Sequence, residues 1–204
     1  MKRLQKFQKF SDEQLMKRIR QGSSEAFDTL YARYSRKLLH FLYRSLGGDE
    51  SKAQDFLHDI FLKIIEKPER FSGRSSFKSW IFTVACNLCK NEYRRQTVRK
   101  AVESKADMDE IALIDENPID EIVDQKMFKT AMLQELGTFS PNQRCTFLLR
   151  FQQGMSIAEI AEIFDCSEGT VKSRLFYTTR KLAQNLHQFN PNRSEVGWNE
   201  KKRM

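Results

Sequence analysis

Helix-starting signals recur along this chain, and they restrict its fold more than any other feature of the sequence. Ser11, Ser140 and Ser156 each stand three residues before Gln or Glu, the spacing of a capping box at a helix N-terminus. Asp49 and Ser167 are further candidate N-caps. Strand signals are scarce, since neither sustained two-residue alternation nor a hairpin dipeptide of the Asn-Gly type is found. We therefore predict an all-α protein.

Apolar residues at intervals of three and four place the expected helices in two groups. The periodicity fades from about residue 96 and returns at about residue 124. We expect two small helical bundles joined by a linker. The predicted segments are a basic N-terminal segment with a short helix (1–22), a first bundle (23–95), an acidic linker (96–123), a second bundle (124–188) and a flexible tail (189–204).

Charge is distributed unevenly between these segments. The chain of 204 residues has a net charge of +8, which points to a polyanionic partner, although a merely basic, solvated surface is the alternative from charge alone. Residues 102–125 hold nine of the 27 acidic residues and a single Lys. The remainder is correspondingly more basic, as expected for two basic bodies joined by an acidic strap.

The chain shows no targeting signal, and its cysteines fit a reducing compartment. The N-terminus lacks the apolar core of a signal peptide, and no run approaches the ~20 apolar residues of a membrane span. We expect a cytoplasmic protein without direct membrane insertion, whose four Cys are thiols. Cys86 and Cys89 have C-x-x-C spacing, so a metal protein that also uses Cys145 and Cys166 is an alternative. Because the C-x-x-C pair lies within a predicted helix, we favour free thiols, with no metal and no cofactor.

Residues 156–184 have the spacing of a helix-turn-helix motif. Two predicted helices flank a short turn at residues 165–167, and Val171, Leu175 and Leu182 recur at four and seven as an inward face. The outer side of the second helix carries Lys172 and Arg180, as a recognition helix in the major groove would. An ordinary helical hairpin with a solvated basic face is the alternative.

Residues 77–95 combine aromatic, aliphatic and basic character on one predicted helix. Helical spacing places Phe77, Trp80, Ile81, Val84 and Leu88 on an inward stripe. Another side carries Thr83, Asn87, Lys90, Asn91 and Arg94. Amides and cations in a row suit the bases and phosphates of a nucleic-acid strand. Taken alone, the segment also fits a core helix with a solvated polar face.

The segment "ESKAQDFLHDIFLKIIEKPERFSGRSSFKSWIFTVACNLCKNEYRR" resembles region 2 of bacterial RNA polymerase sigma factors. The segment "SPNQRCTFLLRFQQGMSIAEIAEIFDCSEGTVKSRLFYTTRKL" resembles their region 4. The small two-domain layout is similar to the extracytoplasmic-function (ECF) group of the sigma-70 family. The resemblance covers about residues 23–95 and 124–186, and the order of its motifs is far more specific than a helix-turn-helix alone.

This resemblance implies a function and a set of site residues. A sigma factor binds core RNA polymerase, directs it to promoters and promotes DNA melting, and it is not an enzyme. The implied core polymerase-binding residues are Asp55, Leu57, Asp59, Ile60 and Phe61. The implied minus-ten residues, which hold the melted non-template strand, are Phe71, Asn87, Lys90, Asn91, Arg94 and Arg95. The implied minus-thirty-five residues, which contact duplex DNA, are Lys172, Ser173, Arg174, Phe176 and Tyr177.

The resemblance also implies partners. These are core RNA polymerase, promoter DNA as duplex and as melted non-template strand, and an anti-sigma factor that some relatives carry in the membrane. The acidic strap would thread the RNA path of the polymerase, or serve only as a solvated spacer.

A stand-alone helix-turn-helix regulator is the rival interpretation. Such a protein would bind duplex DNA alone and would have no use for the polar side of residues 77–95. The three His lie near no nucleophile or carboxylate constellation, so no catalytic residue is predicted.

Overall fold

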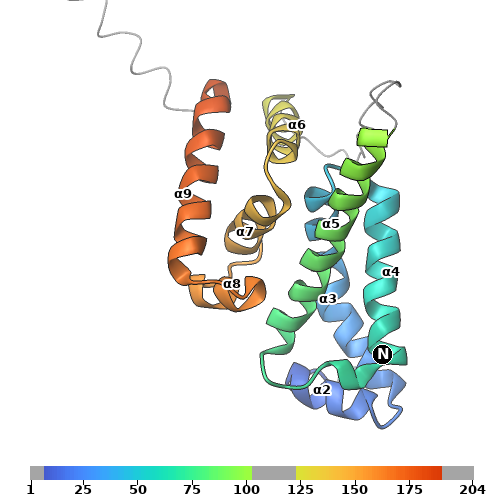
Figure 1. Ribbon diagram of the computed structural model, residues 1–204. Coiled ribbons are helices and arrows are strands. Elements are labelled where there is room, and N and C mark those ends of the chain that lie inside the picture. Colours follow the sequence, from blue (N-terminus) through green and yellow to red (C-terminus); the bar gives the residue numbers. More distant parts are fainter. Residues whose placement is uncertain (1–6, 103–122, 190–204) are drawn as a thin grey trace, which may run out of the picture.

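The computed structural model describes residues 7–102 and 123–189, and every regular element within them is a helix (Figure 1). The α-helices are α2 (Asp12–Ile19), α3 (Ser24–Ser45), α4 (Glu50–Glu66), α5 (Phe77–Val102), α6 (Val123–Gly137), α7 (Pro141–Phe151), α8 (Ile157–Phe164) and α9 (Glu168–Asn185). Two short 3-10 helices are η1 (Pro68–Arg70) and η2 (His187–Phe189). The all-α prediction is confirmed.

The predicted caps determine where these helices begin. Ser11, Ser140 and Ser156 each accept the predicted hydrogen bond and form complete capping boxes. Asp49 and Ser167 cap α4 and α9 through single side-chain bonds. Helix starts were therefore readable from short local sequences, because a cap needs only residues three apart.

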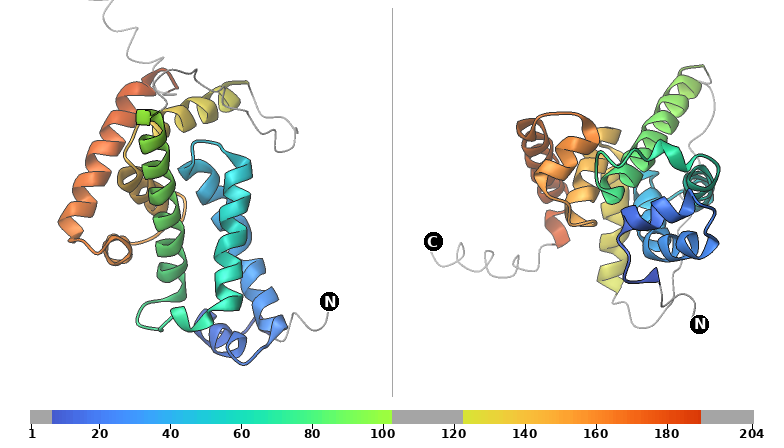
Figure 2. Two further views of the ribbon diagram at one scale, coloured as in Figure 1. Left: turned by 45° about the vertical axis from the view of Figure 1, so that its right-hand side comes forward. Right: turned by 90° about the horizontal axis from the view of Figure 1, so that it is seen from below.

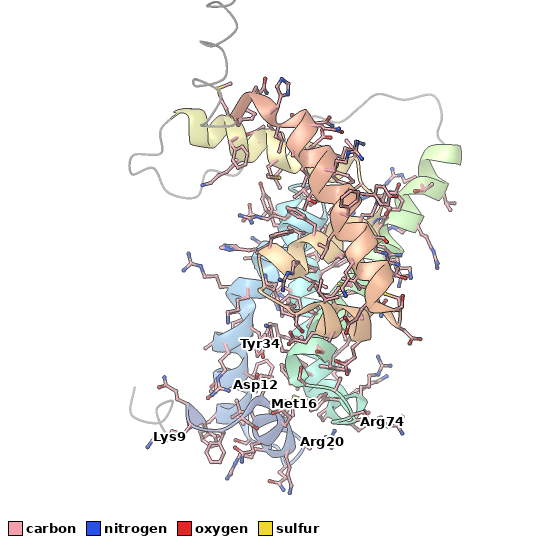
Figure 3. All side chains as sticks on the ribbon, turned by 90° about the vertical axis from the view of Figure 1, so that its left-hand side faces the viewer. Lys9, Asp12, Met16, Arg20, Tyr34 and Arg74 are labelled. Carbon is pink, nitrogen blue, oxygen red and sulfur yellow. The ribbon has the colours of Figure 1, made fainter. Side chains whose placement is uncertain are left out.

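The N-terminal bundle contains α2, α3, α4 and α5, and α2 belongs to it rather than to a separate leading segment. Tyr34 of α3 donates its hydroxyl proton to Asp12, and the Glu13 carboxylate accepts the N–H of Phe77 at 3.1 Å. That bond lowers the pKa of Glu13, because it favours the ionised carboxylate at the start of α5. Figure 3 shows Asp12 and Tyr34 lying together where α2 meets α3.

The C-terminal bundle contains α6 to α9, and it packs directly on the N-terminal bundle (Figures 1 and 2). Helices α7 and α8 lie against α5, and α7 also contacts α3. Arg144 of α7, 7% exposed, donates to the carbonyl of Ser45 at 2.6 Å across this interface. The two predicted bundles are thus present, but their mutual contact had no signal in the sequence analysis.

Because of this contact, the predicted inward stripe of α5 is incomplete. Phe77 and Ile81 are buried as expected, whereas Trp80, Val84 and Leu88 are only half-buried. Six further residues of α5 are buried: the hydrophobic Phe82, Ala85, Cys86 and Cys89 and the polar Ser79 and Glu92. The helix also continues to Val102, beyond the expected start of the linker at residue 96. Most of the predicted acidic strap (residues 103–122 of 102–125) and of the predicted tail (190–204 of 189–204) lies outside the described residues.

Candidate nucleic-acid and polymerase interfaces

Helix α5 has three sides, and two of them each pack against a different bundle. One side meets the N-terminal bundle, where the Phe77 ring lies edge-on to Tyr34 with centroids 5.2 Å apart. A second side meets the C-terminal bundle, where Lys78 donates to the Gln153 carbonyl at 3.3 Å. The third side is exposed and polar. It carries five of the predicted minus-ten residues: Asn87, Lys90, Asn91, Arg94 and Arg95.

An ion pair between the buried Glu92 and the partly exposed Lys52 connects this polar side to α4. Lys52 of α4 contacts Glu92 of α5 at 2.6 Å, and Glu92 is 6% exposed. Glu92 also accepts a bond from Gln96 and lies 3.5 Å from Arg95. Desolvation opposes ionisation of Glu92, but these hydrogen bonds and charges outweigh it and lower the pKa of its carboxyl. Glu92 therefore stays charged at neutral pH and lies within ion-pair distance of the Arg95 guanidinium.

The loop before α5 rests on an aromatic cluster. Phe71, Phe77 and Trp80 lie with all three pairs of ring centroids 5.6 Å apart. Arg20 of α2 donates to the carbonyl oxygens of Pro68 and Phe71, so the start of the loop is held at its backbone. Figure 3 shows Arg20 at the end of α2 nearest the loop that carries Arg74. The exposed loop residues Ser72 and Arg74 are therefore presented next to α5 on a supported backbone.

The predicted minus-ten residue Phe71 is buried. Its side chain is 3% exposed and packs on Phe77 and Trp80. Its place is beneath the loop. Sequence analysis also missed Arg20 and Glu92, the two residues that hold this surface in place. Neither had a recognisable signal, because each acts through a partner more than 35 positions away in the chain.

The helix-turn-helix is formed by α8 and α9. Asp165 ends α8 in the left-handed region at φ 48°, which allows the short turn into the Ser167 cap. Val171, Thr178 and Leu182 are buried, whereas Leu175 is half-buried. Lys172 and Ser173 are exposed, as are Phe176 and Tyr177 at 58% and 62%. Large exposed aromatic rings on a basic helix indicate a binding surface rather than core.

Arg174 differs from its predicted neighbours. Its guanidinium lies 5.3 Å from the centre of the Phe164 ring and contacts Cys166 Sγ at 3.9 Å. The side chain is half-buried across the turn between α8 and α9. Arg174 therefore contributes to the turn itself, whereas Lys172 is exposed and, among the described residues, pairs only with the exposed Glu168, at 3.6 Å.

Helix α4 carries the predicted polymerase-binding residues, and the structure corrects two of them. Ile60 and Phe61 are 1% and 3% exposed, so their side chains hold α4 in the core and are not available to a partner. Asp55 and Asp59 are exposed one turn apart, and Leu57 is half-buried. Sequence analysis missed Leu62 and Ile65, which are 48% and 54% exposed on the same helix. An acidic and aliphatic surface of this kind suits a protein partner.

Among the described residues, no group of three or more potential ligand side chains could hold a metal ion. No helix in that part of the chain is long and apolar enough to cross a membrane. An all-helical protein with a helix-turn-helix and a second exposed basic helix belongs to the class of DNA-binding proteins.

Comparison with known proteins narrows this class to one family. Residues 30–99 match the Sigma-70 region 2 domain, and residues 129–182 match Sigma-70 region 4. The chain is 29% identical over 175 residues to the ECF RNA polymerase sigma factor BldN of Streptomyces coelicolor, covering 85% of this chain and 65% of BldN. It is 30% identical over 151 residues to SigX of Bacillus subtilis, an ECF sigma factor, covering 73% of this chain and 77% of SigX.

The fold agrees with a solved member of the same group. The sigma factor RpoE of Bartonella quintana, in a co-crystal with the anti-sigma factor NepR, aligns with a TM-score of 0.65 at 23% identity, over 79% of this chain and 96% of RpoE. The chain therefore belongs to the ECF group of the sigma-70 family of RNA polymerase sigma factors. Members of this family direct RNA polymerase to promoters and are not enzymes.

Proposed function

We propose that this chain divides the sigma function between two surfaces, with α5 and the loop before it holding melted minus-ten DNA and α9 holding duplex minus-thirty-five DNA. The observation that carries the proposal is the polar side of α5. Five amide and cationic residues are exposed there in one stripe, although the other two sides of the same helix are buried. A stand-alone duplex-binding regulator would not need such a surface.

The polar side of α5 has the chemistry needed to capture a single strand. Lys90, Arg94 and Arg95 supply charge for backbone phosphates, and the Asn87 and Asn91 amides can pair with base edges. Opening DNA costs roughly 1.4 kcal/mol per base-pair step in lost stacking. Capture of an unstacked base returns a few kcal/mol, so several contacts along this side offset part of the cost.

Helix α9 has the chemistry needed for duplex DNA. Lys172 and Ser173 lie in its first turns, where a recognition helix meets base edges, and Phe176 and Tyr177 follow on the exposed side. The exposed apolar rings suit thymine methyl groups and sugar edges, and the cation suits a phosphate or a guanine.

The proposed partners follow from the same surfaces. Asp55 and Asp59 on α4 provide an acidic docking surface for core RNA polymerase, with Leu62 and Ile65 beside them. With this partner we propose a cytoplasmic location. An anti-sigma factor is a further proposed partner, supported by the solved complex of RpoE with NepR.

The arrangement of the two bundles must change during this function. Elements centred ten and thirty-five base pairs upstream of a start site are separated by roughly 85 Å at 3.4 Å per base pair. Helix α9 packs on α7, which itself contacts α5. The bundles therefore have to separate before both surfaces reach their DNA elements, and the described structure is a closed form.

In-vitro transcription tests the proposal. The full chain is added to core RNA polymerase on fragmented genomic DNA, and start sites are mapped. We expect start sites that require both components and share sequence near positions minus ten and minus thirty-five. Binding of duplex DNA by the chain alone, without any dependence of transcription on it, would instead support the stand-alone regulator.

A further inference from the structure

Helix α2 holds the loop before α5 at both of its ends. Near the start of the loop, Arg20, the C-cap of α2, donates from Nε to the Pro68 carbonyl at 3.3 Å and from Nη2 to the Phe71 carbonyl. At the far end, Glu13 in the first turn of α2 accepts the N–H of Phe77, the first residue of α5, at 3.1 Å. Two residues of one short helix therefore bond the backbone on either side of the loop.

Between these two anchors the loop has little support of its own. Within residues 72–76, all of which the structure describes, one hydrogen bond is formed, from the Arg74 N–H to Ser72 Oγ at 3.4 Å. Gly73 turns the chain at φ 75°, and the space where a Cβ would lie is open, so no packing holds this position. The loop therefore depends on its two anchors and on the buried Phe71 ring beneath it.

Helix α2 is itself fixed in the N-terminal bundle. Three of its side chains are buried in the core, and Asp12 accepts hydrogen bonds from Arg33 and Tyr34 of α3 (Figure 3). The bond from the Phe77 N–H lowers the pKa of Glu13, so at neutral pH a charged carboxylate lies at the positive N-terminal end of α5. A helix anchored in this way passes its own position on to both ends of the loop.

We propose that Arg20 and Glu13 are positioning residues for strand capture, which clamp the loop at both ends and so hold Ser72 and Arg74 in place next to α5 without binding DNA themselves. The inference rests on the proposed function, since the position of the loop matters only if the loop and α5 hold the melted strand. The physical reason is preorganisation. A strand that binds a loop already fixed in place loses less binding free energy to ordering that loop.

Glu13 distinguishes this role from a simple effect of charge. If α2 acted on DNA only through its charge, Glu13→Ala would strengthen binding, because it removes a negative charge near a polyanion. The clamp requires the opposite result, because the variant frees the Phe77 N–H and with it the end of the loop. Glu13→Gln keeps an acceptor oxygen and should behave almost as wild type. Lys17→Ala is the charge control for Arg20→Ala, since Lys17 is an exposed cation of α2 that bonds to no described residue of the loop.

The test uses the full chain and its complex with core polymerase on a duplex promoter fragment with a mapped start site. Amide hydrogen exchange of the free chain measures the loop, and permanganate reactivity of thymines measures promoter opening. For Arg20→Ala and for Glu13→Ala we expect faster exchange at residues 72–77 and about tenfold less opening. Lys17→Ala and Glu13→Gln should stay within about twofold of wild type. Affinity for core polymerase should be the same in all four variants.

Thermal melting separates loss of positioning from damage to the fold. If Arg20→Ala melts far below wild type, Arg20→Lys, which keeps one donor, takes its place and should show a smaller effect in the same direction. Unchanged exchange at the loop in both variants refutes the clamp. Faster exchange with unchanged opening, or stronger opening with Glu13→Ala, refutes the positioning role. If the wild-type complex opens no promoter, the proposed function fails, and exchange still decides whether α2 holds the loop.

Discussion

Glu92 supports the exposed polar side of α5 through its pairing with α4. Its carboxylate is buried against Lys52 and lies beside the exposed Arg95. A buried carboxylate is tolerable only when its charge is compensated, and Lys52 supplies that compensation at 2.6 Å. The polar side of α5 therefore depends on one acidic residue that never touches DNA.

Replacement of Glu92 should show this dependence as a function of pH. Glu92→Gln leaves Lys52 without its partner, and because Lys52 is partly exposed we expect a loss of ~1–3 kcal/mol in the free energy of unfolding at pH 7. The pKa of Glu92 is lowered in the folded state, so its stabilising effect is complete above the unfolded pKa of about 4.3 and is lost as pH falls through the folded value.

Urea unfolding at a series of pH values measures both effects. The difference between wild type and Glu92→Gln should shrink below about pH 4. The exposed Glu66→Gln on α4 is the matched control, and we expect a change within about 0.5 kcal/mol. A difference that is constant from pH 7 to pH 3 would contradict the assigned ionisation of Glu92.

On α9, Lys172 and Arg174 should behave differently although both are cations. Lys172→Ala should weaken promoter binding of the holoenzyme by ~1–3 kcal/mol if it contacts a base, with melting temperature unchanged because its pairing with Glu168 is exposed. Arg174→Ala should lower the melting temperature, since it removes the contact with Phe164. Filter binding at fixed salt and thermal melting distinguish them. Equal loss of stability in both variants would refute the assignment.

At the scale of elements, local sequence determined most of what could be predicted. Helix starts at Ser11, Asp49, Ser140, Ser156 and Ser167 follow from caps that need only nearby residues. The burial of Phe82, Cys86 and Cys89 did not follow, because it depends on helices distant in the chain: the Phe82 ring lies edge-on to Phe41 of α3, and α7 and α8 cover another side of α5. A helix buried on two sides has no single apolar stripe to detect.

Prediction of the candidate site was limited in the same way, because local sequence does not reveal packing between distant elements. Exposed polar positions such as Asn87 and Lys172 could be placed from helical spacing, since a core face was recognisable opposite them. Ile60, Phe61 and Phe71 were assigned to contacts by resemblance, and packing shows that their side chains belong to the core. A family resemblance assigns a role to a position in the sequence. Whether the side chain at that position is exposed depends on its neighbours in the fold.

Trp80 and Asn87 test whether α5 separates its structural and DNA-binding sides. Trp80→Ala should lower the free energy of unfolding by ~2–4 kcal/mol, somewhat less than for a fully buried ring, because Trp80 is half-buried against Phe71 and Phe77. Asn87→Ala changes an exposed side chain and should stay within about 0.5 kcal/mol. Thermal and urea melts check both. A large loss of stability in Asn87→Ala would mean that this side of α5 is structural.

The acidic surface of α4 is tested by charge reversal. Asp55→Arg with Asp59→Arg should abolish co-purification with core polymerase, because like charges at an interface cost several kcal/mol. Both residues are exposed, so the circular dichroism spectrum should not change. Glu66→Arg, at the end of the same helix, is the control for added positive charge. Retained binding by the double variant would exclude this surface.

At the scale of the whole molecule, the two bundles pack on each other, and the two surfaces that we propose to bind DNA are both exposed. Arg144 of α7 connects the bundles by donating to the Ser45 carbonyl at the end of α3, and Cys145 Sγ lies 3.9 Å from Ser45 Oγ. The proposed separation of the bundles has to break these contacts. Core polymerase and DNA have to supply more contact energy to the separated bundles than the bundles supply to each other.

The most direct test of the central claim is permanganate reactivity of unpaired thymines at a mapped start site. With core polymerase and the wild-type chain, thymines around position minus ten should become reactive, and neither component alone should produce this. Asn87→Ala should weaken the reactivity on duplex DNA, and a template melted in advance should restore binding, because the unpairing energy is then already supplied. Strong reactivity with Asn87→Ala on several duplex promoters, or none with the wild-type holoenzyme, would contradict the assignment of α5 to strand capture.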